Sequence, residues 1–149
     1  MGIKNQLEEG LQDALRTHDE DKKRVYRMAL ASIKFAEKEQ GKPLEEDKVV
    51  AIIQKEVKIR SEMIEDAGKA AREDTIEGIK AESALLEALL PKQLSVEEVE
   101  AIVSETAKEI QAAGLTDMGK LMKAIMPKVK GIASNDVVSR SVKDYLASL

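Results

Sequence analysis

Apolar residues recur every three or four positions along almost the whole chain, which is the spacing of one helical face. Ile3, Leu7 and Leu11, for example, mark a first helix that ends near residue 17. Six further segments show the same period, and glycine, proline or a polar capping residue separates each from the next. The predicted helices cover about residues 3–17, 19–40, 45–68, 74–90, 95–113, 116–126 and 135–146. This pattern predicts an all-α fold.

Individual residues predict where several of these helices begin and end. Ser95 and Glu98 have the spacing of a capping box, in which a serine precedes the helix and a glutamate follows three residues later. Asp74 is expected to cap the fourth helix, because an aspartate side chain accepts hydrogen bonds from free backbone N–H groups. Gly114 is expected to close the fifth helix, and Pro127 is expected to end the sixth.

The segment between the fourth and fifth helices predicts a division of the chain into two parts. Pro91 stops the fourth helix, since proline has no backbone N–H to continue it. Residues 92–94 then form a short linker. Residues 1–91 are expected to form a four-helix N-terminal bundle, and residues 95–149 a three-helix C-terminal domain.

Composition excludes several classes of chemistry. Aromatic residues make up 2% of the chain, which disfavours β structure. The chain has no cysteine, so disulfides, thiolate catalysis and cysteine-ligated metals are excluded. Its one histidine, His18, excludes any site that needs two. No apolar stretch approaches the roughly 20 residues of a membrane span, and no signal-peptide pattern is present. The protein is therefore expected to be cytoplasmic, without a cofactor and without a membrane partner.

The formal net charge of −4 is unevenly distributed along the chain. Residues 1–91 hold 16 basic and 20 acidic side chains, whereas residues 117–149 hold 6 basic and 3 acidic ones. Only this last segment has a positive excess. Any contact with a polyanion is therefore expected to use the C-terminal end of the chain.

Basic residues in this segment form the strongest candidate site. Lys120 and Lys123 lie about opposite the apolar face of their predicted helix, and the others follow in a turn and on the last helix. Such side chains can neutralise phosphates. Because the segment has no Trp or Phe, it would recognise folded RNA by shape and charge. The alternative interpretation is a solvated basic surface. The predicted nucleic-acid-binding residues are Lys120, Lys123, Lys128, Lys130, Arg140 and Lys143.

Three other constellations have ordinary structural interpretations. Glu56 and Arg60 lie four residues apart on an apolar helix face, which predicts an ion pair with a further partner across the bundle. The alternative role of Glu56 as a general acid or base lacks a nucleophile or second acid. The acidic neighbours of His18 suit a helix N-terminus better than a metal site. Residues 114–121 match G-x-x-x-x-G-K, but a helix precedes them and the final Ser or Thr is missing.

Four groups of residues also carry a resemblance to a known family. They are Asp117-Met118-Gly119-Lys120 with Met126-Pro127-Lys128-Val129-Lys130-Gly131; Leu90-Pro91-Lys92-Gln93-Leu94-Ser95; Arg24, Arg27 and Ser32; and Glu56-Val57-Lys58 with Arg60. These residues resemble the motifs of the YqeY family, and the resemblance covers essentially the whole chain. That family is similar to the C-terminal tail of the B subunit of glutamine-dependent aspartyl/glutamyl-tRNA amidotransferase, a carbon–nitrogen ligase. The resemblance implies two helical bundles and a tRNA-contacting appendage, with catalysis residing elsewhere.

The resulting hypothesis is a non-catalytic helical module that binds tRNA or assists a tRNA-dependent amidotransferase-type enzyme. Amide transfer from glutamine needs a nucleophile, a site for ATP and Mg²⁺ and a route for ammonia. The sequence shows no motif for these, so the chain is not expected to be an enzyme by itself. Ile132 stands where the family usually has a basic residue, which slightly reduces the charge of the tail. The alternative hypothesis is a protein–protein adapter without nucleic-acid contact.

Overall fold

The computed structural model describes residues 2–70 and 72–149 and confirms the all-α prediction. Over these residues it contains α-helices and one short 3-10 helix, and no strand. The elements are α1 (Ile3–Thr17), α2 (Glu20–Gln40), α3 (Glu46–Lys69), α4 (Glu73–Glu87), α5 (Val96–Ile110), the 3-10 helix η1 (Leu115–Asp117), α6 (Met118–Val129) and α7 (Asn135–Ala147).

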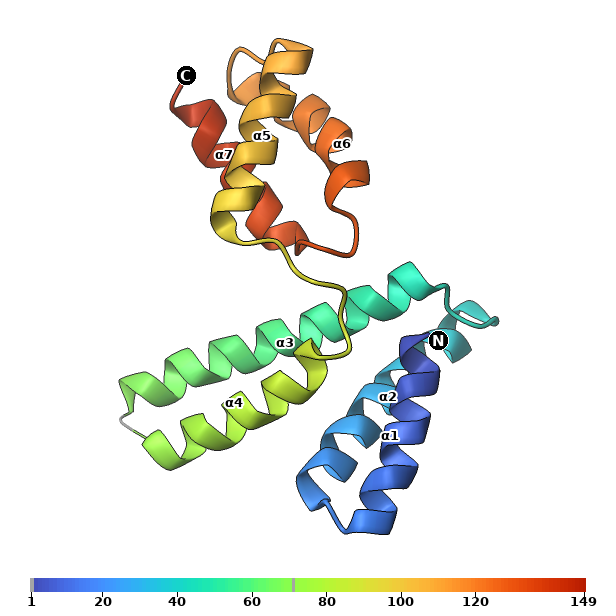
Figure 1. Ribbon diagram of the computed structural model, residues 1–149. Coiled ribbons are helices and arrows are strands. Elements are labelled where there is room, and N and C mark those ends of the chain that lie inside the picture. Colours follow the sequence, from blue (N-terminus) through green and yellow to red (C-terminus); the bar gives the residue numbers. More distant parts are fainter. Residues whose placement is uncertain (1, 71) are drawn as a thin grey trace. The chain divides into compact units, whose positions relative to one another are not determined.

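The chain folds as two compact units, Met1–Leu90 and Pro91–Leu149. Each unit buries its own cluster of apolar side chains. The N-terminal unit is built from two helical hairpins, α1 with α2 and α3 with α4 (Figure 1). Its core consists of Ile3, Leu7, Val25, Tyr26, Ala29, Leu30, Ile33, Val49, Val50, Ile53 and Leu86.

The buried stripe of α1 follows the true helical period. Residues spaced by four advance about 40° around a helix at each step, because one turn holds 3.6 residues. Leu15, three such steps after Ile3, has therefore rotated away from the core and is 45% exposed. Ala14 lies closer in angle to Ile3 and is fully buried in its place.

Glu37 on α2 connects α1 to the segment that leads into α3. Its carboxylate accepts a hydrogen bond from Lys4 Nζ at 2.8 Å and another from the backbone N–H of Leu44 at 3.0 Å. The pKa of the Glu37 carboxyl is lowered, chiefly because Lys4 donates to it and also because Leu44 does. Both bonds favour the ionised form.

The lowered pKa predicts how acid changes the effect of a Glu37→Gln substitution. A carboxyl whose pKa is lower in the folded state stabilises the fold fully above its ordinary pKa of 4.5 and loses this effect as the pH falls through the folded value. Glu37→Gln should therefore be less stable than the wild type at neutral pH, and the difference should shrink in acid. Urea denaturation from pH 7 down to about pH 3 measures both. A difference that stays constant over this range would contradict the prediction.

The C-terminal unit packs α5, α6 and α7 around a second core. Its buried side chains are Val99, Val103, Ala107, Leu121, Ile125, Val129, Ala133, Val138, Val142 and Leu146. The predicted capping box is present at the start of α5: Ser95 accepts from the backbone N–H of Glu98 at 3.1 Å, and Glu98 accepts from that of Ser95 at 3.2 Å. A backbone hydrogen bond also joins the segment before α5 to the loop between α6 and α7, since Leu94 N–H donates to Ile132 O at 2.7 Å.

Four predicted helix boundaries are wrong. Helix α4 ends at Glu87, three residues before the predicted end at residue 90. Helix α4 begins at Glu73, so Asp74 lies in its first turn and does not cap it, although its charge still suits the helix dipole. Helix α5 ends at Ile110, where Gln111 takes the left-handed conformation (φ 56°) expected of Gly114. Helix α6 continues through Pro127 to Val129. Proline removes only one hydrogen bond this close to the end of a helix, and Val129 is buried in the core.

Candidate nucleic-acid interface

The predicted nucleic-acid-binding residues are all exposed in the C-terminal unit, but their surroundings differ. Lys120 and Lys123 lie on α6, three residues apart, and therefore share one helix face. The opposite face buries Leu121, Ile125 and Val129 in the core. Helix α6 contains no Asp or Glu. Within residues 2–70 and 72–149, neither lysine forms an ion pair with a carboxylate.

The side chain of Lys128 bonds to residues of α5 and does not extend only into solvent. Its Nζ donates to Thr106 Oγ1 at 2.9 Å and forms an ion pair with Glu109 Oε2 at 3.2 Å. Eight residues after Lys120, its position is rotated by about 80° around α6, towards the neighbouring helix. The carboxylate of Glu109 therefore partly neutralises the positive charge of Lys128.

The remaining basic residues lie at and beyond the end of α6. Lys130 follows the last helical residue, where a positive charge interacts favourably with the helix dipole. Arg140 and Lys143 lie on the exposed side of α7. Asp136 and Asp144 lie four residues before and after Arg140, so the same helix face also carries two negative charges. The outer face of α6 thus carries only positive charges, whereas the exposed face of α7 carries charges of both signs.

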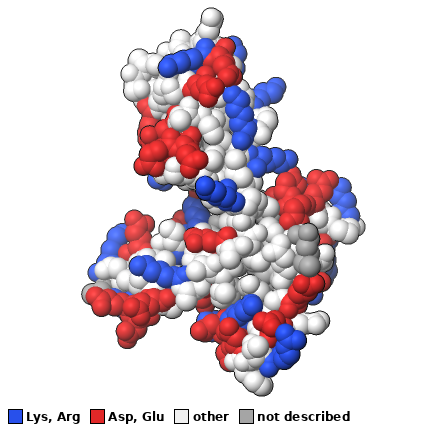
Figure 2. Space-filling view, viewed as in Figure 1, with Lys and Arg blue, Asp and Glu red and all other residues white. Residues whose placement is uncertain are grey.

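Helix α5 has the opposite charge. It carries five glutamates and one lysine, whereas α6 carries three lysines and no acidic residue. On the face seen in Figure 2, basic side chains of the C-terminal unit lie mainly along one edge, and acidic side chains lie in its upper middle and towards the opposite edge. Residues 92–149 nevertheless hold eight basic and eight acidic side chains in all. The charges of α5 and α6 thus differ in sign, and the charges of the whole unit balance in number.

An ion-pair network lies inside the N-terminal unit. Arg60 is 4% exposed, and its Nη1 lies 2.9 Å from Glu56 Oε2. Its Nε lies 3.4 Å from Glu82 Oε2 on α4, and Glu82 also pairs with Arg24 on α2 at 2.7 Å. Arg24 in turn lies 3.2 Å from Asp21. The network therefore connects three helices. Because Arg60 occupies the Glu56 carboxylate, the structure favours a structural role for Glu56 over acid–base chemistry.

Glu82 is the partner of Arg60 across the bundle, and its identity was not predicted from the sequence. The sequence predicts a partner across the bundle but does not identify it, because α4 contains several carboxylates that the pattern alone does not distinguish. The one signal in the sequence is that Glu82 directly precedes Ser83, which lies on the buried side of α4 and is 9% exposed.

The other two constellations occupy ordinary structural positions. His18 is exposed and ends α1 in the left-handed conformation, with φ 60°. Gly114 precedes η1, and Asp117 Oδ2 accepts from Ala113 N–H at 2.8 Å, so this segment joins two helices. No group of three or more His, Cys, Asp or Glu in the described parts of the chain could hold a metal ion. None of the helices described here has the length and apolar character needed to cross a membrane.

Comparison with known proteins agrees with the family resemblance of the sequence motifs. The sequence matches the family described as Yqey-like protein over residues 4–146. No curated protein matches it. Because the family match covers almost the entire chain, this protein belongs to the YqeY-like family.

Proposed function

We propose that the C-terminal unit binds tRNA through the outer face of α6, and that the chain acts as a non-catalytic module that assists a tRNA-dependent enzyme of the amidotransferase type. The observation that carries this proposal is the pair Lys120 and Lys123, exposed on a helix without acidic residues and without an ion-pair partner in the described chain. The separation of this face from the glutamates of α5 supports it.

The proposed contact is with phosphates and the overall shape of the RNA. Tyr145 is the only aromatic side chain of the C-terminal unit, and it packs against the core. The outer face of α6 therefore offers no ring on which a base could stack. Lysines on a convex helix surface suit the backbone of a folded RNA, where each neutralised phosphate releases counterions.

Removing Lys120 and Lys123 together is expected to weaken tRNA binding and its dependence on salt. For Lys120→Ala/Lys123→Ala we expect a dissociation constant about tenfold higher at about 0.1 M salt, and a salt slope of log K lower by about 2, since each phosphate contact contributes about 1. Retention of labelled tRNA over a salt series measures both quantities.

The matched control is Lys55→Ala/Lys80→Ala, which removes two exposed lysines of the N-terminal unit and changes the net charge equally. This control should bind tRNA as the wild type does. Equal losses in the two double variants would show a nonspecific effect of net charge. No retention by the wild type at about 50 mM salt would contradict the proposal, because such contacts are strong at that ionic strength.

A further inference from the structure

The segment that begins at Pro91 and precedes α5 is bound to the loop that joins α6 to α7. The Gln93 side chain donates from Nε2 to Gly131 O at 2.9 Å and to Pro91 O at 2.8 Å. Next to it, Leu94 N–H donates to Ile132 O at 2.7 Å. Leu94 also packs against the core of the C-terminal unit. The segment is therefore held on this unit by side-chain, backbone and apolar contacts.

The loop is itself fixed to the end of α6. Gly131 has a φ of 80°, a conformation that favours glycine and lets the chain turn after the helix. The N–H groups of Ile132 and Ala133 then donate to Val129 O at 3.0 and 3.1 Å. Val129 is the last residue of α6 and is buried in the core. The segment before α5 is thus fixed to the end of α6, although 38 positions separate Gln93 from Gly131 in the sequence.

Lys92 is carried by this fixed segment. Its side chain is exposed, and its ammonium group forms no hydrogen bond or ion pair in the part of the chain that the structure describes. Residues 91–95 and 130–134, which meet here, contain two charged side chains, Lys92 and Lys130, and both are positive. The first acidic residue after the loop is Asp136, in the first turn of α7. The two segments together therefore add a charge of +2 beyond the end of α6.

We propose that Lys92 is a further phosphate-binding residue of the tRNA surface on the C-terminal unit, and that Gln93 is the residue that positions it. This inference rests on the function proposed for α6. Lys123 lies six residues before the end of α6, about 9 Å along the helix axis, and the loop that holds the Lys92 segment lies beyond that end. The contact surface then runs from Lys120 past the end of the helix to Lys92. A lysine whose backbone is already held loses less conformational freedom when it binds a phosphate.

The experiment is retention of labelled tRNA by the full chain over a salt series. Lys92→Ala should raise the dissociation constant about threefold at about 0.1 M salt and lower the salt slope of log K by about 1, the share of one phosphate contact. Lys92→Arg should bind as the wild type does, because it keeps the charge. Gln93→Ala should also weaken binding. In its background Lys92→Ala should cost less than it does alone, since a lysine that is no longer positioned contributes less.

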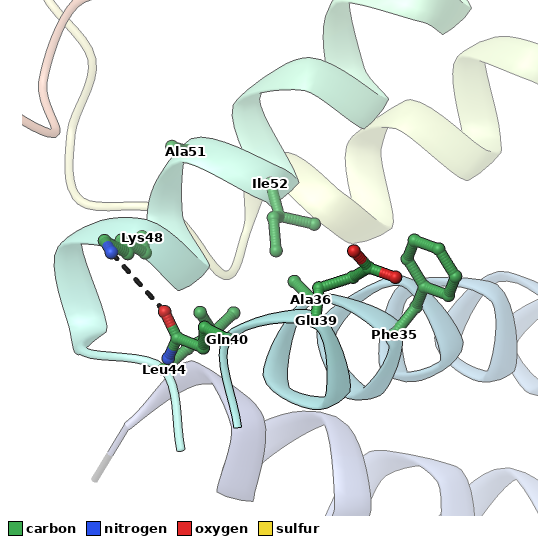
Figure 3. Close-up of a pocket in the computed structure, with 8 residues that line it drawn as sticks. All are labelled: Phe35, Ala36, Glu39, Gln40, Leu44, Lys48, Ala51 and Ile52. Carbon is green, nitrogen blue, oxygen red and sulfur yellow. Dashed lines mark hydrogen bonds between the residues drawn. The ribbon is translucent and has the colours of Figure 1, made fainter. Parts of the chain in front are cut away.

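Two control variants separate this contact from a general loss of positive charge. Lys108→Ala removes an exposed lysine of α5 in the same unit. Lys48→Ala removes one from an apolar groove between α2 and α3 of the N-terminal unit, where Lys48 Nζ donates to Gln40 Oε1 at 3.4 Å (Figure 3). Neither control should change the dissociation constant or the salt slope. Circular dichroism checks that every variant is folded.

The outcomes distinguish this inference from the function on which it rests. If the wild type retains tRNA and Lys120→Ala/Lys123→Ala weakens it, an unchanged dissociation constant and salt slope in Lys92→Ala would overturn the inference alone. So would equal losses in Lys92→Ala and Lys108→Ala, or losses from Lys92→Ala and Gln93→Ala that simply add. A wild type that retains no tRNA at about 50 mM salt would contradict the proposed function, and this inference with it.

Discussion

Leu121→Ala is expected to unfold the C-terminal unit while the N-terminal unit stays folded. Leu121 is fully buried in the core of α5, α6 and α7, and truncation of such a leucine costs about 3 to 5 kcal/mol. A unit of roughly 60 residues has a total stability of only about 3 to 9 kcal/mol. The N-terminal unit has its own buried cluster, which does not include Leu121, so the substitution leaves that core intact.

The two tyrosines of the chain report on the two units separately. Tyr26 is buried in the N-terminal core, and Tyr145 packs against the C-terminal one. With labelled tyrosine rings, Leu121→Ala should move the Tyr145 resonance to its unfolded position and leave that of Tyr26 in place. Leu7→Ala should do the reverse. Leu115→Ala, at a side chain that is 52% exposed, should change neither resonance. Simultaneous loss of both native resonances in one variant would show that the chain unfolds as one cooperative body.

The double substitution Glu56→Gln/Glu82→Gln is expected to destabilise the N-terminal unit by about 3 kcal/mol. Both side chains keep their size and shape, but the buried guanidinium of Arg60 then loses the two carboxylates that pair with it in the described residues. An unpaired buried cation is costly because it has lost its hydration without gaining a compensating charge. Urea denaturation, followed at the Tyr26 resonance, measures this unit alone.

Arg60→Met is the informative comparison for this network. It removes the buried cation, leaves Glu82 paired with Arg24 and leaves Glu56, whose side chain is 18% exposed and can be hydrated, so we expect a cost of about 1 kcal/mol. Lys58→Met removes a half-exposed lysine of the same helix and should have a smaller effect still. If Arg60→Met proved as destabilising as the double glutamine variant, packing of the arginine stem would account for the loss better than its charge does.

The sequence predicted the helices well because each one buries a stripe that repeats with the helical period. It predicted poorly the features that depend on a neighbouring helix. Gln111 adopts a left-handed conformation that local preference assigns to glycine, and it does so where Ala112, the next residue, packs on the core. Helix α6 continues past Pro127 because burial of Val129 outweighs the local preference to stop.

In the candidate site, too, the sequence predicts the local features and not those that depend on a neighbouring helix. The exposure of Lys120 and Lys123 could be read from the apolar face opposite them. The engagement of Lys128 with Thr106 and Glu109 could not, since these residues are about 20 positions away in the sequence and meet it only after α5 and α6 have packed. For the same reason the sequence indicated that Arg60 needs a partner across the bundle, but not which residue supplies it.

The separated charges of the C-terminal unit have a consequence for how it meets another molecule. A unit with charges of opposite sign on neighbouring helices has an electric dipole moment. The field of a polyanion can therefore orient the unit before the two molecules touch, at separations up to the Debye length of about 8 to 10 Å. The unit would approach an RNA with α6 leading and α5 trailing. Orientation during the diffusional encounter mainly raises the association rate. Added salt should therefore lower the association rate with RNA by a larger factor than it raises the dissociation rate.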